Sequence, residues 1–128
     1  MQFGVTDNMN VNESAENYLE TILMLSKKLP VVRSVDIANE LGFKKSSVSI
    51  AMKNLRDKQH ILVSDAGFIT LTDSGKHIAE MIFERHELIS SWLISLGVSK
   101  ETALEDACKM EHVISQESFD AIKKHLGK

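Results

Sequence analysis

The sequence contains a single cysteine and a single proline in 128 residues. One cysteine cannot form an internal disulfide, which excludes a disulfide-stabilised secreted domain and is typical of a reducing compartment. No apolar run approaches the length of a membrane span, and no basic stretch followed by an apolar segment marks a signal peptide. We therefore expect a cytoplasmic protein with no membrane partner.

Positive charge is scarce overall but is concentrated in one segment. The net charge is −3, yet residues 27–58 carry eight basic residues against three acidic ones, a local balance of +5. Residues 1–26 and residues 59–128 each have a balance of −4. A basic segment between acidic ones predicts a contact with phosphates in the middle and a separate region that attracts cations.

The first half of the chain predicts three helices. Apolar residues recur there at helical spacing, Pro30 ends the first stretch, and Gly42 separates the second from the third. We expect Ser14 and Ser34 to cap the first two helices. Two short helices joined at a glycine, the second basic at its start, are typical of a helix-turn-helix. The predicted segments are a flexible tail over 1–13 and helices over 15–28, 35–41 and 45–58.

The period of the apolar pattern changes after residue 60. Residues 61–63 and 68–71 have the composition of strands, and residues 64–67 that of a turn, which together predict a β-hairpin. A hairpin directly after a recognition helix makes a winged helix. The alternative is a generic hairpin that only covers the core.

The second half of the chain predicts helices alone. A long helix runs from Asp73 to about Ile94, and two shorter helices follow, the first capped by Ser99. The long helix, which includes Trp92, has more apolar surface than a winged helix covers, so we expect a homodimer. The predicted fold is mainly α: an N-terminal winged helix-turn-helix with a small hairpin wing over 14–72, then a helical dimerisation region over 73–128.

Lysine and serine residues gather at the start of the third predicted helix. A helix N-terminus attracts phosphate, and the N-terminal half of a recognition helix reaches base edges. The alternative is a solvated polar face with an ordinary serine cap. The expected contacts with double-stranded DNA are Lys44, Lys45, Ser46, Ser47, Ser49 and Lys53.

Cys108, Glu111 and His112 have the spacing i, i+3, i+4, which places them on one face of a helix. A thiol, a carboxylate and an imidazole within one turn are suitable ligands for a transition metal. The alternative is a short buried cysteine beside a solvated Glu-His pair. His86 on the long helix is a further candidate, although a lone histidine is more often an ordinary surface or core residue.

Motifs of catalysis are missing from the sequence. It contains no G-x-S-x-G, no glycine-rich phosphate loop and no CxxC, and Cys108 with His112 lacks a third group to orient a thiol nucleophile. We therefore expect a binding protein and not an enzyme. Two other binding functions remain open. One is a metal-independent winged-helix regulator that senses oxidation through Cys108, and the other is a structural or protein-binding winged helix.

Six short stretches, spread over nearly the whole chain, resemble a known family. In their order they are similar to the DtxR/MntR family of metal-dependent transcriptional repressors, and most closely to its two-domain, manganese-type branch, which lacks an SH3-like domain. The resemblance implies a homodimeric repressor that binds its operator when Mn²⁺ or Fe²⁺ binds between the DNA-binding module and the dimerisation region. Because such a dimer is symmetric, we expect a pseudo-palindromic operator. The stretches are residues 16–22, 34–38, 46–49, 69–76, 85–88 and 107–115.

The same resemblance implies a ligand set that mixes two branches of the family. Asn17 stands where the manganese branch has Asp and the iron branch has Met. Cys108 stands where the manganese branch has Glu and the iron branch has Cys. Leu104 and Ser90 stand where the iron branch has ancillary ligands. The implied metal ligands are Asn17, Glu20, His86, Cys108, Glu111 and His112.

This mixed ligand set has fewer carboxylates than the manganese branch, which predicts unequal metal sites. We expect a weaker second site at Asn17 and Cys108. Activation should follow Mn²⁺ or Fe²⁺, and Zn²⁺ should bind tightly whether or not it activates. The tight site is expected at Glu20, His86, Glu111 and His112.

Overall fold

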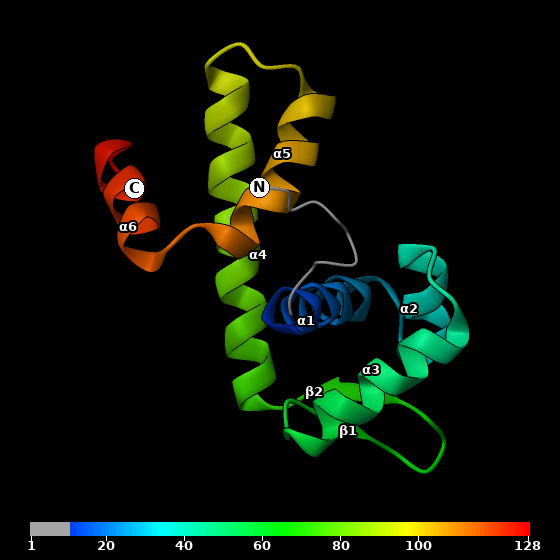
Figure 1. The fold of residues 1–128 in the computed structure, drawn as a ribbon. Coiled ribbons are helices and arrows are strands. Elements are labelled where there is room, and N and C mark those ends of the chain that lie inside the picture. The colour runs from blue at the N-terminus through cyan, green and yellow to red at the C-terminus, as the bar shows by residue number, and fades with distance from the viewer. Residues whose placement is uncertain (1–10) are drawn as a thin grey trace. The chain divides into compact units, whose positions relative to one another are not determined.

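The computed structural model describes residues 11–128, and Figure 1 shows their fold. Within these residues the chain forms helices and one two-stranded hairpin, which confirms the predicted mainly α fold. It divides into two compact units, Met1–Glu80 and Met81–Lys128. No helix of the described residues is long and apolar enough to cross a membrane. The elements are α1 (Val11–Lys28), α2 (Ser34–Leu41), α3 (Lys45–Asp57), β1 (Ile61–Val63), β2 (Ile69–Leu71), α4 (Asp73–Ser95), α5 (Lys100–Val113) and α6 (Gln116–His125).

Helix α1 begins before its predicted start. It extends back to Val11, so Ser14 lies inside the helix and the prediction of a Ser14 cap is wrong. Glu13 is in the first turn, where a negative charge interacts favourably with the helix dipole, and Ala15 is a strong helix former. The predicted tail over 1–13 is therefore shortened by three residues, and its remainder, residues 1–10, lies outside the described residues.

Helices α2 and α3 form the predicted helix-turn-helix. Arg33, not Ser34, is the N-cap of α2, because the Arg33 backbone is extended and its N–H donates to the Asp36 carboxylate at 2.9 Å. Gly42 ends α2 as predicted, with a left-handed φ of 69°. The next residue, Phe43, packs edge-on against Tyr18 of α1, with 6.1 Å between ring centroids. The turn that places the start of α3 is thus attached to the core.

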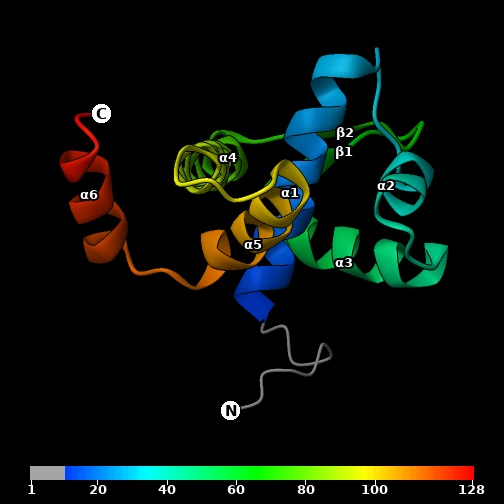
Figure 2. The ribbon, with the colours of Figure 1, turned by 90° about the horizontal axis from the view of Figure 1, so that it is seen from above.

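The wing is an antiparallel pair in which Ile61 lies opposite Leu71 and Val63 opposite Ile69. Both pictures of the ribbon place it beside α1 (Figures 1 and 2). The Ile69 N–H donates to the Val32 carbonyl at 2.8 Å, and the Arg33 guanidinium lies 4.7 Å from the centroid of the Phe68 ring. Strand β2 is therefore bonded on one edge to β1 and on the other to the segment between α1 and α2.

The core of the first unit is made by one face of each element. Ile22 and Ile37 are fully buried on α1 and α2, Val48 on α3, and Ile61 on β1. Each side chain of this size contributes about 1.5–3 kcal/mol when it is fully removed from water. The predicted core residues of α3 are buried, which turns its polar face outward; they are Val48, Met52 and Leu55.

The start of α4 is packed tightly against the segment between α3 and β1. A Cβ atom at Gly75 would lie 2.0 Å from the His60 carbonyl oxygen, so no other residue fits without movement. The Thr72 hydroxyl donates to the Gln59 carbonyl at 2.8 Å and accepts from the Gly75 N–H at 3.2 Å. These contacts fix the first turn of α4 to the base of the wing.

The second unit contains the rest of α4 together with α5 and α6. Ile82 and Ile89 of α4, Ala103 and Ala107 of α5, and Phe119 of α6 supply its buried apolar side chains. Ser99 caps α5 as predicted, because its hydroxyl accepts from the Thr102 N–H at 3.3 Å. Ser115 caps α6 in the same way through the Ser118 N–H at 3.0 Å.

Candidate functional site

A buried carboxylate lies at the centre of the candidate metal site. Glu111, near the end of α5, is only 1% exposed. Its Oε1 lies 2.8 Å from Nδ1 of His86 on α4, and its Oε2 lies 3.3 Å from Nε2 of His112. A buried carboxylate is costly unless it is paired. Two imidazoles on opposite oxygens meet that requirement.

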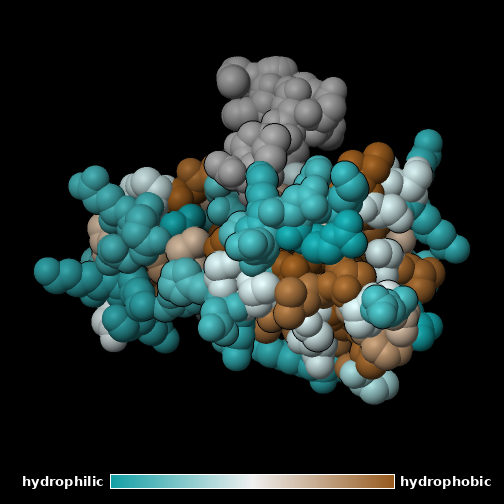
Figure 3. Space-filling model, turned by 90° about the horizontal axis from the view of Figure 1, so that it is seen from below, coloured by the Kyte–Doolittle hydropathy of each residue, from teal (hydrophilic) through white to brown (hydrophobic). Residues whose placement is uncertain are grey.

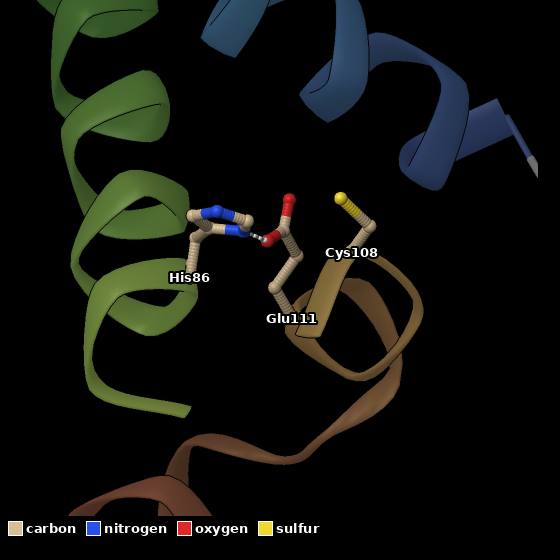
Figure 4. A group of neighbouring side chains, drawn as sticks. All are labelled: His86, Cys108 and Glu111. Atoms are coloured by element: carbon tan, nitrogen blue, oxygen red, sulfur yellow. Dashed lines mark hydrogen bonds and ion pairs between the residues drawn. The ribbon is translucent and has the colours of Figure 1, made fainter. Parts of the chain in front are cut away.

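Cys108 completes this cluster from one turn earlier on α5. Its Sγ and the ligand atoms of His86 and Glu111 all lie within 4.8 Å of one another (Figure 4). Cys108 is exposed whereas Glu111 is buried. The alternative of a buried cysteine beside a solvated Glu-His pair is therefore wrong, because α5 points Glu111 inward and leaves Cys108 exposed.

The cluster strongly favours positive charge. Interactions with Cys108 first and Glu111 second raise the pKa of His86 to about 10 from its ordinary value of 6.5, and partial burial opposes this rise only in part. His86 is thus a cation at neutral pH in the metal-free chain. The Glu111 carboxylate that stabilises the His86 proton would also stabilise a divalent ion bound at the same place.

The donor set fits a first-row transition ion. Such ions bind imidazole nitrogen and carboxylate oxygen at about 2.0–2.2 Å and thiolate sulfur at about 2.3 Å. Ligand atoms that already lie within 4.8 Å of one another need little movement to enclose an ion at these distances. The nitrogen and sulfur ligands suit iron and zinc better than calcium or magnesium, and the carboxylate oxygen also suits manganese.

The two remaining predicted ligands lie in the first unit. Asn17 and Glu20 are half-buried residues on α1, three positions apart and therefore on one side of that helix. The Asn17 backbone carbonyl accepts from the Thr21 hydroxyl at 2.8 Å, as happens inside a regular helix. Their part in metal binding stays a prediction, as does metal binding by the α4 and α5 residues.

The predicted DNA contacts all lie at the exposed face of α3. Lys44 is the N-cap of this helix and Lys45 its first residue. Lys53 lies 3.9 Å from Asp57, but both side chains are more than half exposed, so this pair is weak. Contact with DNA itself stays a prediction. The exposed residues are Lys44, Lys45, Ser46, Ser47, Ser49 and Lys53.

Sequence reasoning missed several residues on or near these sites. Ile50 of α3 is 64% exposed and Leu62 of β1 is 61% exposed. Figure 3 shows that apolar side chains gather among polar ones on the face seen from below. Arg85 is buried beside His86. The sequence did contain a sign of the buried Arg85. Ile82, Arg85 and Ile89 have the spacing i, i+3, i+7, so Arg85 places a charge within an apolar stripe of the helix.

A winged helix with a basic recognition helix, in a chain that also carries a carboxylate-imidazole-thiol cluster, defines a class of DNA-binding proteins with a metal-competent site. Two family models match this chain. Residues 10–64 match the iron dependent repressor N-terminal DNA binding domain, and residues 72–128 match the iron dependent repressor metal binding and dimerisation domain. The chain belongs to this family of metal-dependent transcriptional repressors, which confirms the resemblance stated from the sequence.

Known relatives support the same assignment. The transcriptional regulator MntR of Escherichia coli O6:H1 is 34% identical over 111 residues, which cover 87% of this chain and 72% of the relative. An uncharacterized HTH-type transcriptional regulator of Methanocaldococcus jannaschii is 32% identical over 120 residues, 92% of this chain and 96% of the relative. The solved structure of the manganese regulator SloR superposes with a TM-score of 0.79 at 25% identity. It is matched over 88% of this chain but only 53% of its own length.

Proposed function

We propose that this chain represses genes of metal-ion homeostasis as a cytoplasmic homodimer that binds a pseudo-palindromic operator when Mn²⁺ or Fe²⁺ is bound. The observation that carries the proposal is the buried Glu111 carboxylate between two imidazoles, in the same chain as an exposed recognition helix. SloR, which shares the fold, is a manganese regulator. Zn²⁺ should also bind, since it ranks above Mn²⁺ and Fe²⁺ in affinity for most ligand sets.

The proposed metal centre uses residues of the second unit that already face one another. Glu111 supplies the negative charge, His86 and His112 supply imidazole nitrogens, and Cys108 supplies sulfur or remains a neighbour. A bound divalent ion supplies the positive charge that the His86 proton supplies in its absence. Asn17 and Glu20 are included in the proposed set because of the family resemblance.

The proposed DNA interface is the exposed face of α3 with the wing beside it. Backbone N–H groups at the start of α3 and the side chains of Lys44 and Lys45 suit phosphate, and Ser47 suits a base edge. Ile50 is exposed on the same helix, one turn after Ser46, and its side chain suits a thymine methyl group. We assign residues 14–72 to DNA binding, and residues 73–128 to metal binding and dimerisation.

Metal can favour repression only through a difference in affinity. An ion that binds the DNA-competent arrangement more tightly than other arrangements shifts the population toward it by that difference and no more. The Glu111 cluster therefore has to be better formed in the DNA-bound state than in the free state. Loss of the Glu111 charge should remove the metal response and leave the recognition helix intact.

A DNA mobility assay tests the proposal. The wild-type chain is measured with chelator and with Mn²⁺, Fe²⁺ under anaerobic conditions, and Zn²⁺, beside Glu111→Gln. The matched control is Glu105→Gln, an exposed glutamate of the same helix. We expect metal-dependent retardation in the wild type and in Glu105→Gln, and its loss in Glu111→Gln. Retardation that is equal with chelator and with metal contradicts the proposal.

A second function is favoured by one observation, the exposed Cys108 thiol within 4.8 Å of the His86 imidazole. In that case Cys108 thiolate attacks hydrogen peroxide, the O–O bond breaks, and sulfenic acid and hydroxide form. DNA binding would then be lost with peroxide, kept in Cys108→Ala with peroxide, and indifferent to chelator. These three results together would replace metal activation by redox sensing.

A further inference from the structure

Arg85 is a buried arginine next to a proposed metal ligand. It is 7% exposed and precedes His86 on α4. Its Nη1 donates to the backbone carbonyls of Glu111 at 3.1 Å and Ile114 at 2.9 Å. Carbonyls at the end of a helix have no partner inside the helix, and the negative end of the helix dipole favours a cation there. Arg85 thus binds the C-terminal end of α5.

Two successive residues of α4 therefore hold one residue of α5. Arg85 holds Glu111 by its backbone carbonyl, and His86 contacts the same residue by its carboxylate. The direction of a side chain depends on where its backbone is fixed. We propose that Arg85 is a positioning residue for the metal centre, which aims the Glu111 carboxylate without contacting the ion. This inference rests on the proposed metal-binding function.

The geometry of the guanidinium explains why arginine is needed. Its Nη2 donates to the Gln116 side chain at 2.9 Å while Nη1 serves the two carbonyls. A planar fork with donors in fixed directions can meet three acceptors at once, whereas a lysine ammonium is a single point of charge. Arg85→Lys should keep the buried charge and lose the alignment.

The guanidinium carbon of Arg85 also lies 5.6 Å from the centroid of the Phe119 ring, a cation–π contact that partly offsets the burial of its charge. Within residues 11–128, Arg85 Nε is the buried side-chain nitrogen that lacks a hydrogen-bond partner. A buried charge with an unmet donor is costly, but Arg85→Met alone also leaves the Glu111 and Ile114 carbonyls without this partner. Arg85→Met fills the space and removes both the charge and the alignment, whereas Arg85→Lys removes the alignment alone, so the two variants together separate positioning from folding.

The same region offers a matched control. Lys123 of α6 forms an ion pair with Glu84 of α4, one residue before Arg85. This pair also joins α6 to α4, but it does not contact the carbonyls of α5. Lys123→Ala should weaken the contact between α4 and α6 and leave the Glu111 carbonyl bound to Arg85. If metal affinity falls because α6 is loosened, it should fall in Lys123→Ala and in the Arg85 variants. If it falls because the end of α5 is released, it should fall in the Arg85 variants alone.

The test is calorimetric titration with Mn²⁺ of the full chain, well below the melting temperature, with circular dichroism to verify the helical content. We expect Arg85→Met and Arg85→Lys to bind Mn²⁺ about 10- to 100-fold more weakly than the wild type, the usual range for residues that orient metal ligands. Lys123→Ala should bind like the wild type.

Wild-type Mn²⁺ affinity in a folded Arg85 variant overturns the inference, as does an equal loss in Lys123→Ala. If Arg85→Met does not fold, Arg85→Lys decides, because it keeps the positive charge and the apolar stem. A wild-type chain that binds no Mn²⁺, Fe²⁺ or Zn²⁺ instead refutes the proposed function, so the two failures are distinguishable.

Discussion

Glu111 combines burial with charge, two properties that rarely occur together in a side chain. His86 and His112 contact its two oxygens. The imidazoles in turn are held in place by a carboxylate that solvent does not reach. The proton of His86 is stabilised in this group, so the pH of the solution should change the stability of the metal-free chain.

The direction of this pH effect follows from His86. Its pKa is raised from 6.5 to about 10 in the folded chain, so folding is favoured by the bound proton. This contribution is fully present below pH 6.5, declines as the pH rises above that value, and is lost by about pH 10. In urea titrations with chelator at pH 6, 8 and 9, we expect the stability difference between the wild type and His86→Gln to shrink with rising pH. A difference that stays constant would contradict this account.

Cys108 decides how soft the proposed site is. Its Sγ is close enough to His86 and Glu111 to share an ion with them, and a thiolate favours Fe²⁺ or Zn²⁺ over Mn²⁺. We expect Cys108→Glu to tighten Mn²⁺ binding and raise the occupancy of a second site in calorimetry, because it adds a hard ligand and a negative charge. Cys108→Ala is the control. An unchanged Mn²⁺ titration in both variants would show that the Cys108 side chain is not a ligand.

At the level of elements, the sequence predicted helices and strands better than it predicted their ends. Apolar periodicity located α3 and its core face, and glycine located the end of α2. Ser14 and Ser34 were wrong as caps because a cap depends on the backbone angles of one residue, and the neighbouring residues were equally able to begin a helix. Spacing along α5 put Glu111 and His112 together, but it could not show that α4 would bring His86 to them.

The partners of Arg85 show the limit of sequence reasoning most clearly. The bonds to Glu111 and Ile114 use backbone carbonyls, which every residue possesses and which leave no trace in the sequence. Helical spacing shows only that a charge interrupts the apolar stripe of α4. The identity of its acceptors depends on how α5 ends, and that is a property of the folded second unit.

Helix α3 should bind DNA mainly through charge. We expect Lys44→Ala and Lys53→Ala to weaken binding to all sequences. Each should reduce the slope of log affinity against log salt by about 1.8, because a dimer loses one phosphate contact from each of its two subunits. Lys76→Ala, an exposed lysine of α4, is the control and should keep the wild-type slope. Ser47→Ala should instead change the preferred sequence. Unchanged slopes in both α3 variants would mean that α3 is not the recognition helix.

The junction between the wing and α4 has no free space for a side chain. Because a Cβ at Gly75 would meet the His60 carbonyl at 2.0 Å, Gly75→Ala should force the backbone apart and destabilise the chain by about 1–3 kcal/mol in urea titrations. Lys76→Ala, at the next position and exposed, should stay within about 0.5 kcal/mol of the wild type. Equal stability of both variants would show that the junction yields easily.

At the scale of the whole molecule, exposed apolar side chains of the second unit suggest how copies associate. Leu96 is 64% exposed and Val113 is 67% exposed, and Ile94 adds a third apolar side chain at the end of α4. We expect a dimer in sedimentation velocity at micromolar concentration, with or without metal, because burial of such surface needs no ion. A monomer under these conditions, with Mn²⁺ present, would contradict the proposed symmetric operator complex.

The bond between Val32 and Ile69 has a consequence for how the protein avoids aggregation. A two-stranded hairpin has unpaired N–H and C=O groups along both outer edges, and such edges recruit strands from other chains. The Val32 carbonyl covers the outer N–H of Ile69, and each strand is only three residues long. Little backbone is left for a foreign strand to pair with, so the wing can remain exposed for DNA without linking one copy of the protein to the next.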